Sequence, residues 1–107
     1  MEKFTLKLAC GEFENCWFEC GKYNEPKNLY LAVHNKDGVM CVCTINDGEY
    51  NGDDCITVKD YSENEGMTRF LMDKGIINYN DVRKIKFSGY VCLQTFGLTA
   101  KGKMLFK

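Results

Sequence analysis

Apolar and polar residues alternate along several stretches of this chain, as they do in strands that bury one face. Residues 4–9 (FTLKLA) follow this pattern, and the mixed run at 16–23 (CWFECGKY) predicts a second strand at the edge of a sheet. The apolar runs at 28–35 and 39–46 flank an aspartate–glycine pair, which supplies the positive φ that tight turns require. We therefore predict a hairpin between these two runs.

The second half of the chain predicts a loop and further strands. The run 46–54 (NDGEYNGDD) is rich in turn-forming polar residues and predicts a loop. Strands are expected at 55–61, 81–89 and 90–98. Alternation within the run 81–89 would give an extended backbone one basic face. The residues expected on that face are Val82, Lys84 and Lys86, opposite Arg83, Ile85 and Phe87.

The stretch VKDYSENEGMTRFLMDKG (58–75) places acidic residues, a serine and a tyrosine just ahead of an apolar run. Ser62 followed by Glu65 fits a capping box, in which each side chain bonds the other residue's backbone amide at the start of a helix. The apolar residues at helical spacing beyond it are Met67, Phe70 and Leu71. Gly75 stands where a left-handed C-terminal cap is expected. We therefore interpret the cluster as the start of a helix over about 62–75 and not as a catalytic site.

Together these elements predict an α+β fold: a mostly antiparallel sheet of about five or six strands with one helix (about 62–75) packed on it. The 107 residues and the hydrophobic content of 45% fit a single domain over 1–107. No stretch approaches the ~20 apolar residues that span a bilayer, and the polar N-terminal run lacks the apolar core of a secretory signal. We expect a cytoplasmic protein without membrane contact, either a monomer or a homodimer formed through an edge strand.

Charge is distributed unevenly along the chain. Residues 1–66 hold 13 acidic and 6 basic residues, a net −7, whereas residues 67–107 hold 2 acidic and 8 basic residues, a net +6. The acidic loop residues that could form a binding surface are Asp47, Glu49, Asp53 and Asp54. Such a surface can cover a basic groove on a protein partner. The alternative is a nucleic-acid surface in the basic half, formed by Arg83, Lys84, Lys86 and Tyr90.

Seven cysteines raise the question of disulfides or metal binding. Their odd number and the lack of an export signal favour reduced thiols, which serve as small apolar core residues. The alternative is a zinc-stabilised module that uses Cys16-x₃-Cys20 and Cys41-x-Cys43. This spacing fits a zinc knuckle poorly, so no metal ligand and no cofactor is expected.

Catalytic chemistry finds little support in the residues. His34 is the single histidine of the sequence, which excludes arrangements of two histidines. The glycine-containing runs lack the spacing and the lysine of a phosphate-binding loop. We therefore predict that the protein is not an enzyme.

Four segments, led by VKDYSENEG, resemble a small uncharacterised bacterial family, a domain-of-unknown-function group carried on conjugative elements, plasmids and phages. The segments are LAVHNKDGVMCVCTIN, VKDYSENEGM, LMDKGII and GYVCLQTFGL. The resemblance implies a mobile-element setting and no catalytic residues. Together with the charge split, it gives our leading hypothesis: a small non-enzymatic interaction protein with a protein partner, for example an anti-CRISPR-like inhibitor of a host defence system. Nucleic-acid binding is the alternative, and a zinc-stabilised module is a third.

Overall fold

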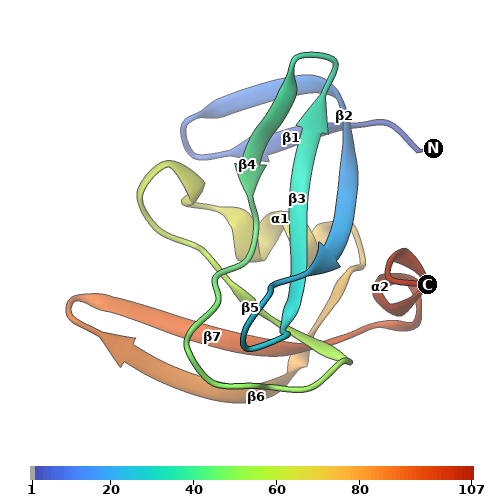
Figure 1. Ribbon diagram of the computed structural model, residues 1–107. Coiled ribbons are helices and arrows are strands. Elements are labelled where there is room, and N and C mark those ends of the chain that lie inside the picture. Colours follow the sequence, from blue (N-terminus) through green and yellow to red (C-terminus); the bar gives the residue numbers. More distant parts are fainter. Residues whose placement is uncertain (1) are drawn as a thin grey trace.

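The computed structural model describes residues 2–107, which form two antiparallel sheets and short helices (Figure 1). The first sheet is a four-stranded meander in the order β1-β2-β3-β4. Its strands are β1 (Phe4–Leu8), β2 (Gly11–Lys22), β3 (Leu29–Asn35) and β4 (Gly38–Val42). The predicted hairpin is confirmed, because β3 and β4 pair across a tight turn and Gly38 has a φ of 113°. The expectation of an edge strand at 16–23 is wrong, since β2 lies between β1 and β3.

The second sheet has three strands in the order β5-β7-β6. Its strands are β5 (Cys55–Val58), β6 (Ile77–Ser88) and β7 (Val91–Leu98). The two sheets meet at the residues that follow β4, where Thr44 bridges Val58. Cys43 donates its backbone N–H to Leu31 O at 2.8 Å and accepts from Lys59 N at 2.8 Å, so this segment lies between β3 and β5. In Figure 1 β3 and β4 of the first sheet run up the picture, whereas β6 and β7 of the second sheet run across it.

Short helices complete the fold. They are a 3₁₀ turn (Ser62–Asn64), α1 (Met67–Asp73) and α2 (Ala100–Leu105). The predicted α+β class with antiparallel sheets is confirmed, with seven strands where the sequence predicted five or six. The sequence did not predict α2. Thr99 begins this helix as its N-cap, and its hydroxyl accepts from Gly102 N at 3.0 Å.

The predicted helix over about 62–75 begins later than expected, at Met67. Its N-cap is Gly66, which has a φ of 100°, and no capping box forms between Ser62 and Glu65. The carboxylate of Asp60 instead accepts from Gly66 N at 2.8 Å and from Thr68 N at 3.0 Å. A residue with positive φ interrupts a right-handed helix, and glycine adopts this conformation readily. Residues 62–64 therefore form a separate 3₁₀ turn, and α1 begins only after Gly66.

The C-terminal end of α1 follows the prediction. Gly75 has a φ of 74°, and its N–H binds Met72 O at 2.9 Å. Ile76 N binds Leu71 O at 2.9 Å, which completes a Schellman motif. The end of α1 is therefore fixed by its glycine, as the sequence indicates.

A single hydrophobic core lies between the two sheets and α1. The helix contributes Met67, Phe70 and Leu71, all buried as the helical spacing predicts. Phe70 packs against Phe4 of β1, with ring centroids 5.6 Å apart, and against Phe18 of β2, with centroids 6.3 Å apart. These aromatic contacts hold α1 beside the first sheet, because each buried ring removes a large apolar area from water.

Candidate functional site

The acidic and basic residues predicted as alternative binding surfaces mostly face each other. Lys84 Nζ lies 2.6 Å from Asp47 Oδ2 and 3.7 Å from Glu49 Oε1. Lys86 Nζ lies 3.1 Å from the same Glu49 oxygen and donates to Asp47 O at 2.9 Å. The loop 46–54 thus lies against one face of β6, and its carboxylates neutralise the lysines there. We call this set of contacts the charge network.

Asp47 is the most enclosed member of the charge network, since its side chain is fully buried. Its Oδ1 accepts from Glu49 N at 3.2 Å and from Asn51 Nδ2 at 3.2 Å. Burial raises the pKa of this carboxyl, but hydrogen bonds from Lys84, Glu49 N and Asn51 outweigh it and lower the pKa overall. Asp47 is therefore a charged anchor of the loop and is not available to a partner.

Arg83 and Asp54 form a second part of the charge network. Arg83 Nη1 lies 3.1 Å from Asp54 Oδ1, and Arg83 Nε lies 2.8 Å from Asp81 Oδ1. A Cβ on Gly97 would lie 2.0 Å from Asp81 and 2.8 Å from Arg83. The absence of a side chain at Gly97 therefore lets this pair lie flat across β7.

Arg83 is also the extra residue of a β-bulge. Val82 pairs with Phe96 and Lys84 pairs with Thr95, so β6 advances two residues while β7 advances one. Such a bulge moves every preceding side chain to the other face. The predicted alternation is therefore wrong at Val82, which shares a face with Ile85, and at Arg83, which lies over Gly97 on the face of the lysines.

Two of the predicted site residues lie outside the charge network. Asp53 accepts from the Tyr50 hydroxyl at 2.8 Å and lies 3.5 Å from Lys22 Nζ. Tyr90 is fully exposed, in the turn between β6 and β7. The structure thus brings Asp47, Glu49 and Asp54 together with the basic strand and leaves Asp53 and Tyr90 apart.

Asn28, which the sequence did not single out, holds the loop 46–54 in place. Its buried side chain donates to Asn46 Oδ1 at 2.9 Å and to Glu49 O at 2.7 Å. Its Oδ1 accepts from Asn51 N at 2.7 Å. A buried asparagine needs such partners, but nothing in its sequence context reveals that they lie about twenty residues away.

The opposite face of the β6–β7 hairpin exposes apolar side chains. Val82, Ile85 and Phe87 pair with Phe96, Gln94 and Cys92 of β7, so all of them share one face. Along this face Phe96 is 1% exposed, whereas Ile85 is 55% and Phe87 75% exposed. This face therefore covers the core at the Phe96 end of the hairpin and is exposed to solvent at the hairpin tip. We call the three exposed side chains of β6 on this face, together with Tyr90 of the adjoining turn, the hairpin patch; its residues are Val82, Ile85, Phe87 and Tyr90.

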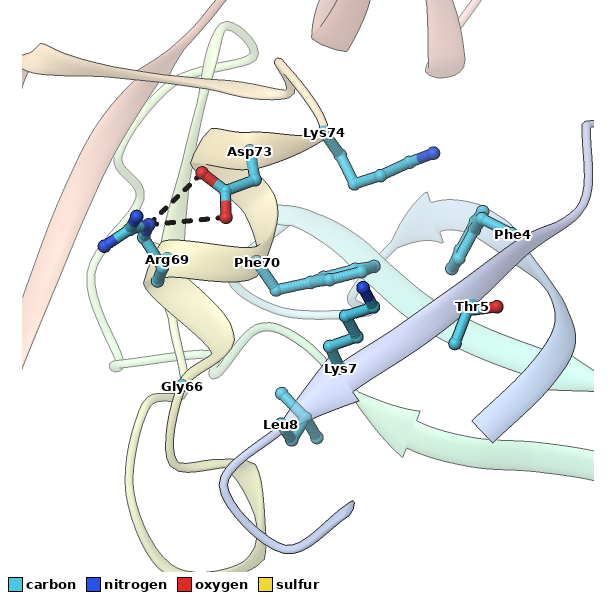
Figure 2. A pocket seen from close by; sticks show the side chains of 9 residues that line it. All are labelled: Phe4, Thr5, Lys7, Leu8, Gly66, Arg69, Phe70, Asp73 and Lys74. Carbon is cyan, nitrogen blue, oxygen red and sulfur yellow. Dashed lines mark hydrogen bonds and ion pairs between the residues drawn. The ribbon is translucent and has the colours of Figure 1, made fainter. Parts of the chain in front are cut away.

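A groove of about 520 Å³ separates β1 from α1 (Figure 2). Phe70 projects from the helix toward β1, where Phe4 and Leu8 lie along the strand. At Gly66 the two elements come close together, since an added Cβ would lie 3.3 Å from Ala9 N. We call this feature the β1–α1 groove.

The four cysteines considered as zinc ligands do not converge. Cys20 pairs with Leu31 and Cys41 pairs with Val33, so β3 separates the cysteines of β2 from Cys41 of β4 and from Cys43, which follows β4. Two strands of a sheet that are separated by a third strand lie ~10 Å from each other. This distance is too large for their thiolates to bind one metal ion. Within residues 2–107, no group of three or more histidine, cysteine or acidic side chains is placed to hold a metal.

The described thiols are free, and most are protected. Burial raises the pKa of Cys20 to about 11 and that of Cys43 well above its ordinary value. Cys10 and Cys92 are exposed. Cys16, Cys43 and Cys55 are buried and serve as small apolar core residues, as the sequence predicts. The pKa of Cys41, by contrast, is lowered by a hydrogen bond with Cys43.

Comparison with protein-family models, with curated proteins and with solved structures gave no match. The resemblance to a mobile-element family therefore stays a prediction. Within the described residues, no helix combines the length and the apolar character needed to cross a bilayer.

Proposed function

We propose that this protein is a non-enzymatic protein-binding module that contacts its partner through the hairpin patch. The observation that carries the proposal is the uncovered apolar face at the tip of the β6–β7 hairpin. Phe87 is 75% exposed and Tyr90 fully exposed. Burying a side chain such as phenylalanine is worth about 1.5–3 kcal/mol, so several large apolar side chains left in water at one end of a hairpin are typical of an interaction surface.

The composition of the patch suits a folded protein partner. Aromatic side chains dominate the binding energy of protein interfaces, because they bury large areas at a small cost in conformational entropy. The hairpin also presents them on a paired backbone, since β6 and β7 stay in register out to Ser88 and Val91 at the tip. The patch can therefore enter an apolar recess of a partner without folding on binding.

The charge network argues against the acidic surface as the main contact. Lys84 and Lys86 already neutralise Asp47 and Glu49, which leaves less charge to cover a basic groove of a partner. The hypothesis of a host-defence partner is based on the charge split and the sequence resemblance, and the charge network leaves the resemblance as its main support. We therefore propose a protein partner bound through an apolar contact, whether or not that partner belongs to a host defence system.

Nucleic-acid binding remains the alternative function. Tyr90 and Phe87 are exposed and could stack on bases. However, Lys84 and Lys86 are held by Asp47 and Glu49, so phosphate contacts would compete with intramolecular ion pairs. The geometry favours the protein partner over this reading.

Photocrosslinking from the hairpin tests the proposal. With benzoylphenylalanine in place of Tyr90, we expect a protein adduct from a lysate of the source cell, before and after nuclease treatment. The same group in place of Val39, which is 57% exposed in β4, is the matched control and should give no such adduct.

Substitution of the patch supplies an independent measurement. Phe87→Ser should reduce retention of the captured protein by about tenfold or more, since loss of a buried aromatic anchor commonly costs over 1.4 kcal/mol. Circular dichroism should show an unchanged fold, because Phe87 is exposed. Equal adducts from both positions, or unaltered retention by Phe87→Ser, would refute the proposal. Adducts lost on nuclease treatment would favour the nucleic-acid alternative.

A further inference from the structure

The β1–α1 groove combines a free strand edge with a neighbouring helix. β1 is the first strand in the order of its sheet, so only β2 pairs with it along its length. Leu8 pairs with Gly11 across a two-residue turn, and Leu6 pairs with Phe13. In an antiparallel hairpin these residues direct their backbone groups at the partner strand. The intervening residues Thr5 and Lys7 therefore direct theirs away from β2.

The bulge in this hairpin does not disturb that alternation. Phe4 pairs with Cys16 and Leu6 with Phe13, so the extra residue belongs to β2, where Asn15 has a φ of 59°. β1 itself stays regular, and Thr5 and Lys7 both line the groove. The backbone groups of these two residues thus offer a short ladder to an incoming strand.

The walls of the groove are apolar. Phe4 and Leu8 come from β1, and Phe70 comes from α1. The Phe4 and Phe70 rings are 5.6 Å apart, with the Lys74 ammonium 4.7 Å from the centre of the Phe4 ring. An extended segment directs alternate side chains to one side, so its apolar residues would rest on these walls.

The charges around the groove select for acidic segments. Arg69 Nε binds both carboxylate oxygens of Asp73, at 3.2 and 3.3 Å, so these two charges offset each other (Figure 2). Lys74 is offset in the same way, since Glu2 Oε2 lies 3.7 Å from its Nζ. Lys7 forms no ion pair within the described residues, so it gives the groove its positive sign. The chain as a whole carries a net charge of −1, so this positive groove is a local feature.

We infer that the β1–α1 groove binds an extended acidic segment of a partner protein, which adds as a strand to the free edge of β1. Main-chain hydrogen bonds to Thr5 and Lys7 hold the segment, and apolar residues at alternate positions fill the space against Phe70. A second copy of this chain is a poorer occupant, because it would bring the same two lysines against Lys7 and Lys74. The inference adds a surface that is separate from the hairpin patch.

Binding of defined peptide pools tests this inference. One pool carries glutamate or aspartate at alternate positions, with valine, leucine, isoleucine or phenylalanine between them, and a matched pool carries lysine or arginine instead. We expect fluorescence anisotropy to show binding of the acidic pool, with the basic pool at least about tenfold weaker. N-methylation of alternate backbone amides of the acidic peptides should abolish binding. It replaces the N–H groups that an added strand donates to its neighbour, and the methyl groups keep the two backbones apart.

Two protein variants and a direct readout complete the design. Lys7→Glu should weaken the acidic pool about tenfold, whereas Lys36→Glu, in the turn between β3 and β4, should leave the affinity unchanged. Hydrogen exchange should show the amides of Thr5 and Lys7 becoming protected in the complex.

Four results would overturn the inference: no binding of the acidic pool, equal binding of the basic pool, equal binding of N-methylated peptides, or unchanged exchange at Thr5 and Lys7. A dimer that protects the same two amides and excludes the peptides would identify a second copy as the occupant. Because Phe87→Ser leaves the groove untouched, its effect on peptide binding should be nil, and the two surfaces can be tested separately.

Discussion

At the scale of single residues, Lys84 determines how the loop 46–54 joins the second sheet. Its ammonium contacts Asp47 at 2.6 Å and Asn51 Oδ1 at 2.7 Å. Asp47 is fully buried on the loop side, while Lys84 keeps 26% of its side-chain surface exposed. A buried carboxylate that loses its cation is left desolvated without compensation. The Lys84–Asp47 ion pair should therefore contribute more to stability than an exposed ion pair does.

We expect Lys84→Ala to destabilise the protein by about 2 kcal/mol, because it leaves Asp47 buried without its ammonium. Urea denaturation at pH 7 measures this change. Lys86→Ala is the matched control and should cost less than about 1 kcal/mol, since its partner Glu49 is 61% exposed. Equal losses for the two variants would show that burial of Asp47 does not set the strength of the network.

At the scale of elements, glycines let the backbone of each short helix pack closely against a neighbouring segment. Gly66 begins α1 against β1, and Gly102 brings α2 against the segment after α1. A Cβ on Gly102 would lie 2.2 Å from Ile76 O. The hydroxyl of Thr99 also binds Gly75 O, so α2 is fastened to the end of α1 at two points.

Gly102→Ala should therefore destabilise the protein by about 2 kcal/mol, although alanine favours helices by ~1 kcal/mol over glycine. Thermal and urea denaturation measure the loss. Lys103→Ala, at an exposed neighbouring position of the same helix, should change stability by less than about 0.5 kcal/mol. A gain in stability for Gly102→Ala would mean that α2 does not need this close contact.

The elements that the sequence predicted correctly are those fixed by neighbours along the chain. The hairpin at Gly38 and the helix end at Gly75 each depend on a glycine within a few residues. The predicted start of α1 was wrong because its first amides are bound by Asp60, which lies farther from them along the chain than the four-residue span of a capping box. The contact of Lys84 with Asn51 spans 33 residues, and the bulge at Arg83 depends on pairing with β7. Neither leaves a local pattern, so the charge network and the hairpin patch could not be foreseen.

At the scale of the whole molecule, folding cancels part of the charge asymmetry of the sequence. The acidic loop and the basic strand belong to different halves of the chain, yet they lie against each other between the loop and β6. Ion pairs and hydrogen bonds across the molecule lower the pKa values of several carboxyl groups. Hydrogen bonds lower those of Asp47, Asp53 and Asp81, and Lys59 lowers that of Glu63 to about 2. These carboxylates favour the folded state only while they are ionised.

We therefore expect acid to destabilise the fold. A carboxyl whose pKa is lower in the folded than in the unfolded state contributes stability above the unfolded value, near 4, and loses it as the pH falls through the folded value. The free energy of unfolding should be nearly constant from about pH 7 to 5 and decline from about pH 4 to 2. Urea titrations across this range measure it. Lys84→Ala should flatten the decline, and stability that rises toward pH 2 would contradict the prediction.

The neutralised charge network also has a kinetic consequence for partners. Electrostatic attraction accelerates encounters when a surface carries net charge of one sign. Because Lys84, Lys86 and Arg83 are matched by carboxylates beside the hairpin, a partner approaching that tip gains little long-range guidance. Its association should proceed at the unsteered rate of about 10⁵–10⁶ M⁻¹ s⁻¹. Selectivity at the hairpin must then arise after collision, in how long the complex lasts.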